Sequence, residues 1–214
     1  MKFCVAVFSM RSNWLLGHPE RSKLRVRVLA DSKMKKVISD NTVTGHLPPH
    51  YRRLMQEEGI LEHDCEIAAW DAAVRVRDRL QEQNRSVELN LGEAGQCLYV
   101  FQMHDSVCSD GKFIDMNPQL RSGRQPRACL YVGKTSQERC ERYSQHRDEA
   151  HPASTRWGTG YFLMPFAEAY RGDLILAYQQ TGEATDTLTH YHALKGEYRL
   201  RCWLQASGFA AYSR

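Results

Sequence analysis

The stretch Cys129-Leu130-Tyr131-Val132-Gly133-Lys134-Thr135 decides the fold of the sequence around it. It is an apolar run with a β-branched residue and an aromatic residue, which is typical of a buried strand, and Gly133 predicts a turn where the strand ends. The following polar run, from Gln137 to Arg147, contains no Pro or Gly, and Ser136 or Thr135 is suited to cap its beginning. The sequence therefore predicts a strand, a glycine turn and a helix in succession.

The predicted helix gathers cationic side chains on one face. Arg142 and His146 are four residues apart and so lie one turn apart on the same side, where Arg139 can join them. Together with Tyr131 and Lys134, this face carries the donors that could hold a phosphodiester. Alone, each residue is more often an exposed Arg, a structural His or a core Tyr, so the combination carries the prediction.

The tetrapeptide Cys-Leu-Tyr-Val occurs twice, at 97–100 and at 129–132. Two such strands joined by a connection suggest an antiparallel pair whose tyrosines, Tyr99 and Tyr131, lie near each other. The connection from Asp105 to Arg127 contains Asp-Gly, Asn-Pro and Gln-Pro pairs and is interpreted as a long, polar, basic loop. Long loops tend to be functional, so we expect it to contact DNA through Arg124 and Arg127.

These residues resemble the signature of the GIY-YIG nuclease superfamily. Leu98-Tyr99 is similar to the end of its first motif, Gly-Ile-Tyr, and Tyr131-Val132-Gly133 is similar to its second, Tyr-Ile-Gly. Arg142-Tyr143-Ser144-Gln145-His146 resembles the Arg-x-x-x-His on the next helix. The family also has a Glu on a later helix that binds one divalent metal, and Glu197 looks like that residue. The resemblance covers residues 95–214.

The sequence departs from the family pattern at three points. Cys97 replaces the Gly of the first motif, and the gap between Tyr99 and Tyr131 is long, which implies an insertion in the hairpin. Many members carry an Asn after the metal-binding Glu, whereas Tyr212-Ser213 occupies that neighbourhood here. The role of that Asn is not transferred to the asparagines elsewhere: Asn41, Asn84, Asn90 and Asn117.

The resemblance implies an α/β (α+β) fold with a small, mostly antiparallel, three-stranded sheet flanked by helices. It also implies a metal-dependent endonuclease acting on DNA, in which Tyr99, aided by His146, activates a water and Arg142 holds the scissile phosphate. Mg²⁺ or Mn²⁺ on Glu197 would stabilise the leaving 3′ oxygen. Since a phenol has a pKa near 10, Tyr99 needs nearby positive charge for this role. Further phosphate contacts are expected from Tyr131, Lys134, Arg139 and Arg156.

Gly196, beside Glu197, has two interpretations. Inside a helix a Gly costs about 1 kcal/mol, so it would be retained for the close approach of a backbone or ligand. Alternatively, Gly196 simply begins the helix.

The remaining sequence predicts further elements. In the N-terminal region, residues 1–92, we expect an opening strand, a strand at Leu24–Val28, a helix at Glu62–Gln83 and a strand at Val87–Leu91. The helix should bury a stripe of apolar side chains: Ile67, Trp70, Val74 and Leu80. This region would serve target selection, and residues 93–214 would form the nuclease domain. There, Asp173–Tyr178 and Phe209–Tyr212 are interpreted as strands.

Composition leaves the class of protein open. The chain has 214 residues and 29 Lys and Arg against 25 Asp and Glu, so its net charge of +4 alone does not argue for a nucleic-acid partner. Its seven cysteines include no Cys-x-x-Cys pair, which fits reduced thiols in a cytoplasmic protein better than disulfides or a zinc ribbon. No apolar stretch suits a membrane span. Cutting both strands would require a dimer or successive nicks.

Two other functions remain compatible with these patterns. One is a nucleic-acid-binding module whose GIY-YIG-like nuclease site has decayed. The other is an interaction protein in which the two tyrosines only pack in the core.

Overall fold

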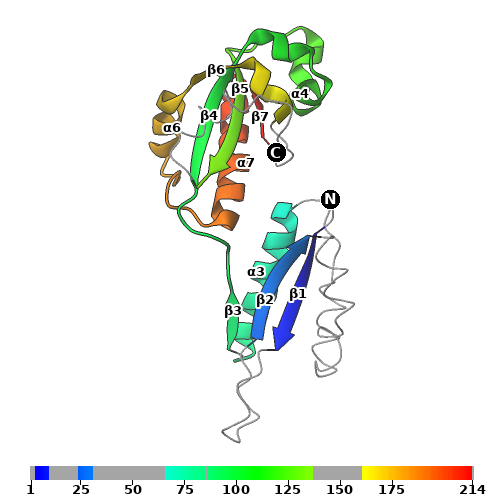
Figure 1. Ribbon diagram of the computed structural model, residues 1–214, viewed down its shortest axis with the longest axis vertical. Helices are drawn as coiled ribbons and strands as arrows, with labels where there is room; N and C mark the ends of the chain where they lie inside the picture. Colours follow the sequence, from blue (N-terminus) through cyan, green and yellow to red (C-terminus); the bar gives the residue numbers. More distant parts are fainter. Residues whose placement is uncertain (1–2, 10–23, 31–65, 85, 137–160, 214) are drawn as a thin grey trace, which may run out of the picture. The chain divides into compact units, whose positions relative to one another are not determined.

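The computed structural model describes residues 3–9, 24–30, 66–84, 86–136 and 161–213 (Figure 1). The chain divides into two compact units, Met1–Asn90 and Leu91–Arg214. Each unit combines a sheet with helices, so the α/β (α+β) class is confirmed. Within the described residues, no helix has the length and apolar character to span a membrane.

In the residues that the structure describes, the first unit is a three-stranded sheet packed against a helix. Strand β2 (Leu24–Ala30) lies between β1 (Phe3–Ser9), which is antiparallel to it, and β3 (Val87–Leu89), which is parallel. Helix α3 (Glu66–Glu82) buries one face against this sheet. Its buried side chains lie at 69, 70, 72, 73, 76 and 80. Trp70 and Leu80 were expected there; Ile67 and Val74 are only partly buried.

The second unit contains a four-stranded mixed sheet, which corrects the expectation of three mostly antiparallel strands. Its order is β6 (Ala167–Tyr170), β4 (Cys97–Met103), β5 (Cys129–Thr135), β7 (Ala210–Tyr212). Strand β4 is antiparallel to both β5 and β6, whereas β7 adds to β5 in parallel. The expected last strand is therefore confirmed.

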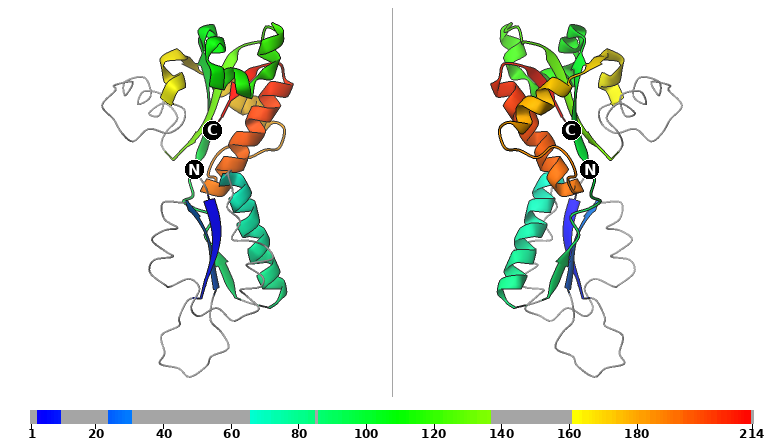
Figure 2. Two further views of the ribbon diagram at one scale, coloured as in Figure 1. Left: turned by 90° about the vertical axis from the view of Figure 1, so that its right-hand side faces the viewer. Right: turned by 90° about the vertical axis from the view of Figure 1, so that its left-hand side faces the viewer.

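Side chains alternate between the two faces of this sheet along each strand, and helices cover the apolar side chains on both faces. On one face, Leu98, Val100, Leu130 and Val132 form a core with α6 (Gly172–Gln179) and α7 (His190–Ala206). On the other face, Tyr99, Phe101, Cys129 and Tyr131 pack with buried side chains of the 3-10 helices η3 (Asp105–Ser109) and η5 (Tyr161–Phe166) and of α4 (Gly111–Met116). Figure 2 shows α7 and η5 on opposite sides of the sheet.

The connection between β4 and β5 is not the irregular loop that its turn residues predicted. It contains η3, α4 and a further 3-10 helix, η4 (Pro118–Ser122). Asp110 is the N-cap of α4, since its side chain accepts hydrogen bonds from the backbone N–H groups of Lys112 and Phe113. The Asp-Gly pair thus begins a helix, and Phe113 is fully buried in the core.

The segment interpreted as a strand at Asp173–Tyr178 is instead helix α6. Its buried residues, Leu174, Ile175 and Tyr178, have helical spacing, while Leu176 between them is 62% exposed. A short apolar run does not distinguish a strand from a buried helix, which explains the error.

Candidate functional site

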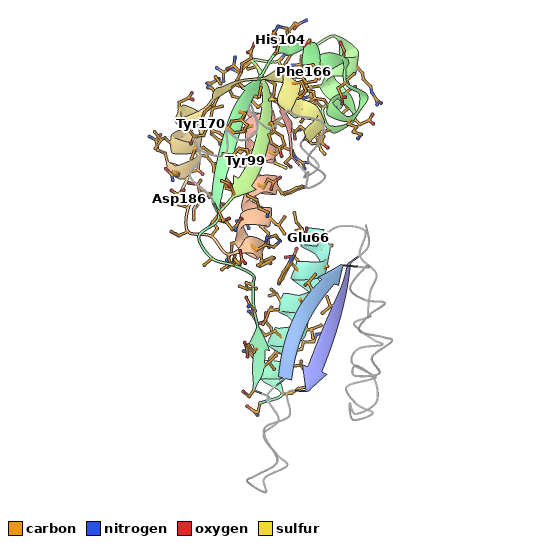
Figure 3. All side chains as sticks on the ribbon, in the orientation of Figure 1. Glu66, Tyr99, His104, Phe166, Tyr170 and Asp186 are labelled. Atoms are coloured by element: carbon orange, nitrogen blue, oxygen red, sulfur yellow. The ribbon has the colours of Figure 1, made fainter. Side chains whose placement is uncertain are left out.

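Tyr99 and Gly133 face each other across β4 and β5. A Cβ atom at Gly133 would lie 2.4 Å from both Cζ and Oη of Tyr99, so the ring occupies the space that any other side chain would need. The expectation of a turn at Gly133 is wrong, because β5 continues to Thr135. Tyr99, which Figure 3 labels, therefore requires a glycine at this position of the neighbouring strand.

Tyr99 and Tyr131 are neighbours, as their repeated tetrapeptide predicted. Their ring centroids are 6.0 Å apart, and Tyr99 also contacts Phe101 at 4.7 Å. The row extends to β7, where Tyr212 stacks on Tyr131 at 6.5 Å. Tyr99 is 2% exposed and Tyr131 is 6% exposed. The two tyrosines therefore also contribute to the core.

Tyr212 lies where the family pattern has an Asn. Burial raises the pKa of its phenol, and the negative charge of Asp110 adds to that effect, while Arg201 acts in the opposite direction. Tyr212 is consequently a neutral phenol at neutral pH, which can donate a hydrogen bond but is not a base.

Lys134, expected to neutralise a phosphate, contacts the first residue of α7. Its Nζ lies 3.2 Å from Nδ1 of His190, and an ammonium group can only donate, so Nδ1 accepts. Gly92 lies close to this histidine, since a Cβ at Gly92 would lie 2.4 Å from the His190 Cβ. The contact between Lys134 and His190 was not predicted, because the two residues are 56 apart in sequence.

Gly196 lies inside α7, so it does not begin the helix. A Cβ there would lie 3.0 Å from Cδ1 of Leu98, which is fully buried. Gly196 therefore permits the close approach of α7 to β4.

The position of Glu197 follows from the hydrogen bonds of the same helix. Gln205 Nε2 donates to the carbonyl of Ala211 in β7 at 3.1 Å, and Arg201, one turn earlier, reaches Met116 Sδ. Residues 197, 201 and 205 lie on one face of the helix, so this face lies towards the edge of the sheet that β7 forms.

Glu197 lies at the end of the sheet that holds the Tyr99 and Gly133 pair. Helix α7 leads through a short turn into β7 and runs opposite to it, and Ala211 pairs with Leu130. The eight residues from Gln205 back to Glu197 span about 12 Å of helix, which is the length of about four residues of a strand. Glu197 is thus level with Lys134 and Leu98, in agreement with the contact of Gly196 to Leu98. It approaches from the α7 side, whereas Tyr99 faces the other side.

Glu197 is 5% exposed, and a carboxylate is a hard oxygen ligand suited to Mg²⁺. No group of three or more His, Cys, Asp or Glu that could hold a metal occurs within the described ranges. If Glu197 held a metal, as the resemblance implies, waters and phosphate oxygens would have to supply most of the other ligands. Mg²⁺ tolerates this arrangement because it dehydrates reluctantly, so the donor set fits that ion.

Two residues that contact α7 or lie in it were missed in the sequence. Arg201 stacks over the Tyr198 ring at 4.9 Å, and its buried Nε has no hydrogen-bond partner in the part of the chain that the structure describes. Asn117 is fully buried, and its Oδ1 accepts from the backbone N–H of Ala211 at 2.9 Å and from Gln205 at 3.1 Å. The contacts of Asn117 join residues more than 80 apart, so no local pattern could have indicated them.

The two basic residues expected to contact DNA lie near the end of α7. Arg127 donates to the carbonyl of Ser207 at 3.3 Å and stacks over Phe209 at 5.5 Å. Arg124 is exposed and lines a hollow of about 380 Å³ that also includes Gln119, Gln125 and Phe209. Arg127 thus has a structural contact, whereas Arg124 faces open space.

Arg139, Arg142, His146 and Arg156 lie outside the described residues, as does the helix predicted after Ser136. The structure places Tyr99 and Tyr131 on one face of the sheet, and Lys134 and Glu197 on the opposite face, which α7 covers.

Comparison with known protein families, with curated proteins and with solved structures found no match to this chain.

Proposed function

We propose that the second unit, Leu91–Arg214, is a divalent-metal-dependent DNA endonuclease of the GIY-YIG type. The observation that carries the proposal is the packing of Tyr99 on Gly133. These residues belong to the two short motifs on which the resemblance rests. The Tyr99 ring fills the space that is left because Gly133 has no side chain.

The surrounding geometry supports the same assignment. Lys134 follows Gly133 directly, and Glu197 lies on α7 level with Lys134. Arg139, Arg142 and His146 come next in sequence after β5 and complete the proposed site. In this site Tyr99 and His146 would orient and deprotonate a water, while Arg142 would hold the scissile phosphate by charge-assisted hydrogen bonds.

Glu197 would hold the metal, Mg²⁺ or Mn²⁺. When bound, the ion would supply positive charge to stabilise the oxygen that leaves the phosphorus. Lys134 would add a second positive charge near the phosphate, and the Nε of Arg201 is a further donor in the same region of α7. The first unit would select the DNA target.

The burial of Tyr99 favours one alternative. At 2% exposure, its hydroxyl requires local movement before a substrate water can reach it. Together with Cys97 in place of the motif glycine, this supports a catalytically decayed module that binds nucleic acid without cleaving it.

A cleavage assay separates these functions. The full chain is incubated with supercoiled plasmid and with single-stranded DNA, in Mg²⁺, in Mn²⁺ and in EDTA. We expect cleavage only with metal, and a loss of about 100-fold or more in rate for Arg142→Ala and for Glu197→Gln. Binding of DNA by these variants should remain within a few-fold of the wild type.

Glu183→Gln is the matched control. Glu183 is a partly exposed carboxylate paired with Arg199 at 3.3 Å and has no role in the proposed chemistry, so this variant should cleave like the wild type. If neither DNA form is cut with either metal, the enzyme proposal fails. Salt-dependent binding without cleavage would then identify the decayed module, and absence of binding would indicate an interaction protein.

A further inference from the structure

Cys108 and Cys129 lie against each other although they are 21 residues apart. Their Sγ atoms are separated by 3.0 Å. Cys108 belongs to η3, and Cys129 is the first residue of β5. Both carry free thiols, as do Cys97 and Cys202 among the described residues. Cys97 has a different neighbour, because its thiol approaches the carbonyl of Gly95.

The two thiols differ in their access to solvent. Cys129 is fully buried in the aromatic and apolar core, whereas Cys108 is partly exposed. Burial, followed by the contact with Cys108, raises the pKa of the Cys129 thiol well above its ordinary value. Cys129 is therefore protonated at neutral pH, and a small oxidant from solvent meets Cys108 first.

We propose that Cys108 and Cys129 form an oxidation site, at which a peroxide converts the two thiols into an intramolecular disulfide. The Cys108 thiol gives up its proton and its sulfur attacks one peroxide oxygen. The O–O bond breaks, Cys108 becomes a sulfenic acid, and the departing hydroxide takes up the proton and leaves as water. The Cys129 sulfur then attacks the Cys108 sulfur, the S–O bond breaks, and the departing oxygen takes the Cys129 proton as a second water. Two thiols are thereby oxidised and one hydrogen peroxide is reduced to two waters.

The secondary structure at the pair allows this bond to form. A disulfide has an S–S length of about 2.05 Å, so the two sulfur atoms, now 3.0 Å apart, must approach by about 1 Å. Cys129 is held in β5 by its pairing with β4 and β7, at Met103 and Ala210. The short helix η3 lies outside the sheet and can supply the movement. The bond would enclose α4 and η4 in a covalent loop and restrict the unfolded chain.

Peptide mapping of the full chain tests the proposal. The reduced protein is treated with hydrogen peroxide, alkylated and cleaved by trypsin without reduction. Cleavage after Arg85, Lys112, Arg127 and Lys134 yields peptides 86–112 and 128–134, and we expect these two to be joined. Peptide 86–112 contains Cys97 as well as Cys108, so variants must identify the partner. The linked peptide should persist in Cys97→Ser and disappear in Cys108→Ser.

Stability gives an independent readout. Oxidation should raise the thermal midpoint of the wild type by several degrees and should leave the midpoint of Cys108→Ser unchanged. If Cys108→Ser does not fold, Cys108→Ala takes its place. Linkage through Cys97 or another cysteine would overturn the proposal, as would oxidation of Cys108 to a sulfinic acid without a crosslink. The outcome is independent of nuclease activity.

Discussion

Gly133→Ala tests the packing on which the proposed site depends. The added Cβ would lie 2.4 Å from Cζ and Oη of Tyr99 and 2.8 Å from Cε2. Carbon atoms in favourable contact are about 3.5 Å apart, so the ring must move by about 1 Å. Tyr99 is 2% exposed and contacts Phe101 and Tyr131, so the movement disturbs the whole aromatic row.

The magnitude combines two opposing effects. Overpacking a core costs about 1–3 kcal/mol. Replacing Gly by Ala in a strand recovers about 0.5–1 kcal/mol of backbone entropy. The net loss in the free energy of unfolding should be about 1–2 kcal/mol, which lowers the melting temperature of a unit of this size by about 4–8 °C.

The assay is urea and thermal unfolding of the wild type, Gly133→Ala and the control Gly111→Ala. A Cβ atom added at Gly111 would meet no described atom within 4 Å, so this position should tolerate Ala with a change of about 0.5 kcal/mol or less. A double-mutant cycle with Tyr99→Leu then isolates the contact. Gly133→Ala should cost at least about 1 kcal/mol less when Tyr99 is Leu, because the clashing ring is absent. Additive effects, or a neutral Gly133→Ala, would refute the argument.

Two further predictions concern buried polar groups of the second unit. Asn117→Ala should lower the free energy of unfolding by about 1–3 kcal/mol, because it leaves the buried N–H of Ala211 without its acceptor and removes one of the three acceptors of Gln205 Nε2. Gln125→Ala, which truncates an exposed amide of the same unit, serves as the control in urea unfolding, and equal effects would contradict the assignment. Burial raises the pKa of Tyr178 from 10.0 to about 12, so the folded state binds its proton more tightly than the unfolded state. The resulting contribution to the free energy of unfolding is complete below pH 10, and about 2–3 kcal/mol of it is lost as the pH rises from 10 to 12. Tyr178→Phe should flatten this alkaline loss of stability. An unchanged loss would show that other groups cause it.

The sequence predicted the elements whose pattern is local. The repeated tetrapeptide gave the β4 and β5 pair and the contact between Tyr99 and Tyr131. Alternation and helical periodicity gave the strands of the first unit, helix α3 and the last strand, β7. These predictions succeeded because the period of the apolar residues reports directly which face is buried.

The errors arose where a local signal has two structural meanings. An apolar run at Asp173–Tyr178 suits a strand or a buried helix, and only its packing on β4 and α7 makes it α6. Asp-Gly at 110–111 suits a turn or a helix cap, and the burial of Phe113 selects the cap. Gly133 suits a turn or a strand under a large side chain, and Tyr99 decides between them.

The sequence by itself thus predicted the fold class and the two tyrosine strands, and its resemblance to a nuclease family named Glu197 and Lys134 as candidate site residues. Only the tertiary structure decided that β7 joins β5 in parallel, that His190 contacts Lys134 and that Asn117 and Gln205 fasten α7 to β7. The physical reason is that patterning along the chain records burial, whereas contacts between distant residues depend on the register and direction in which whole elements pack.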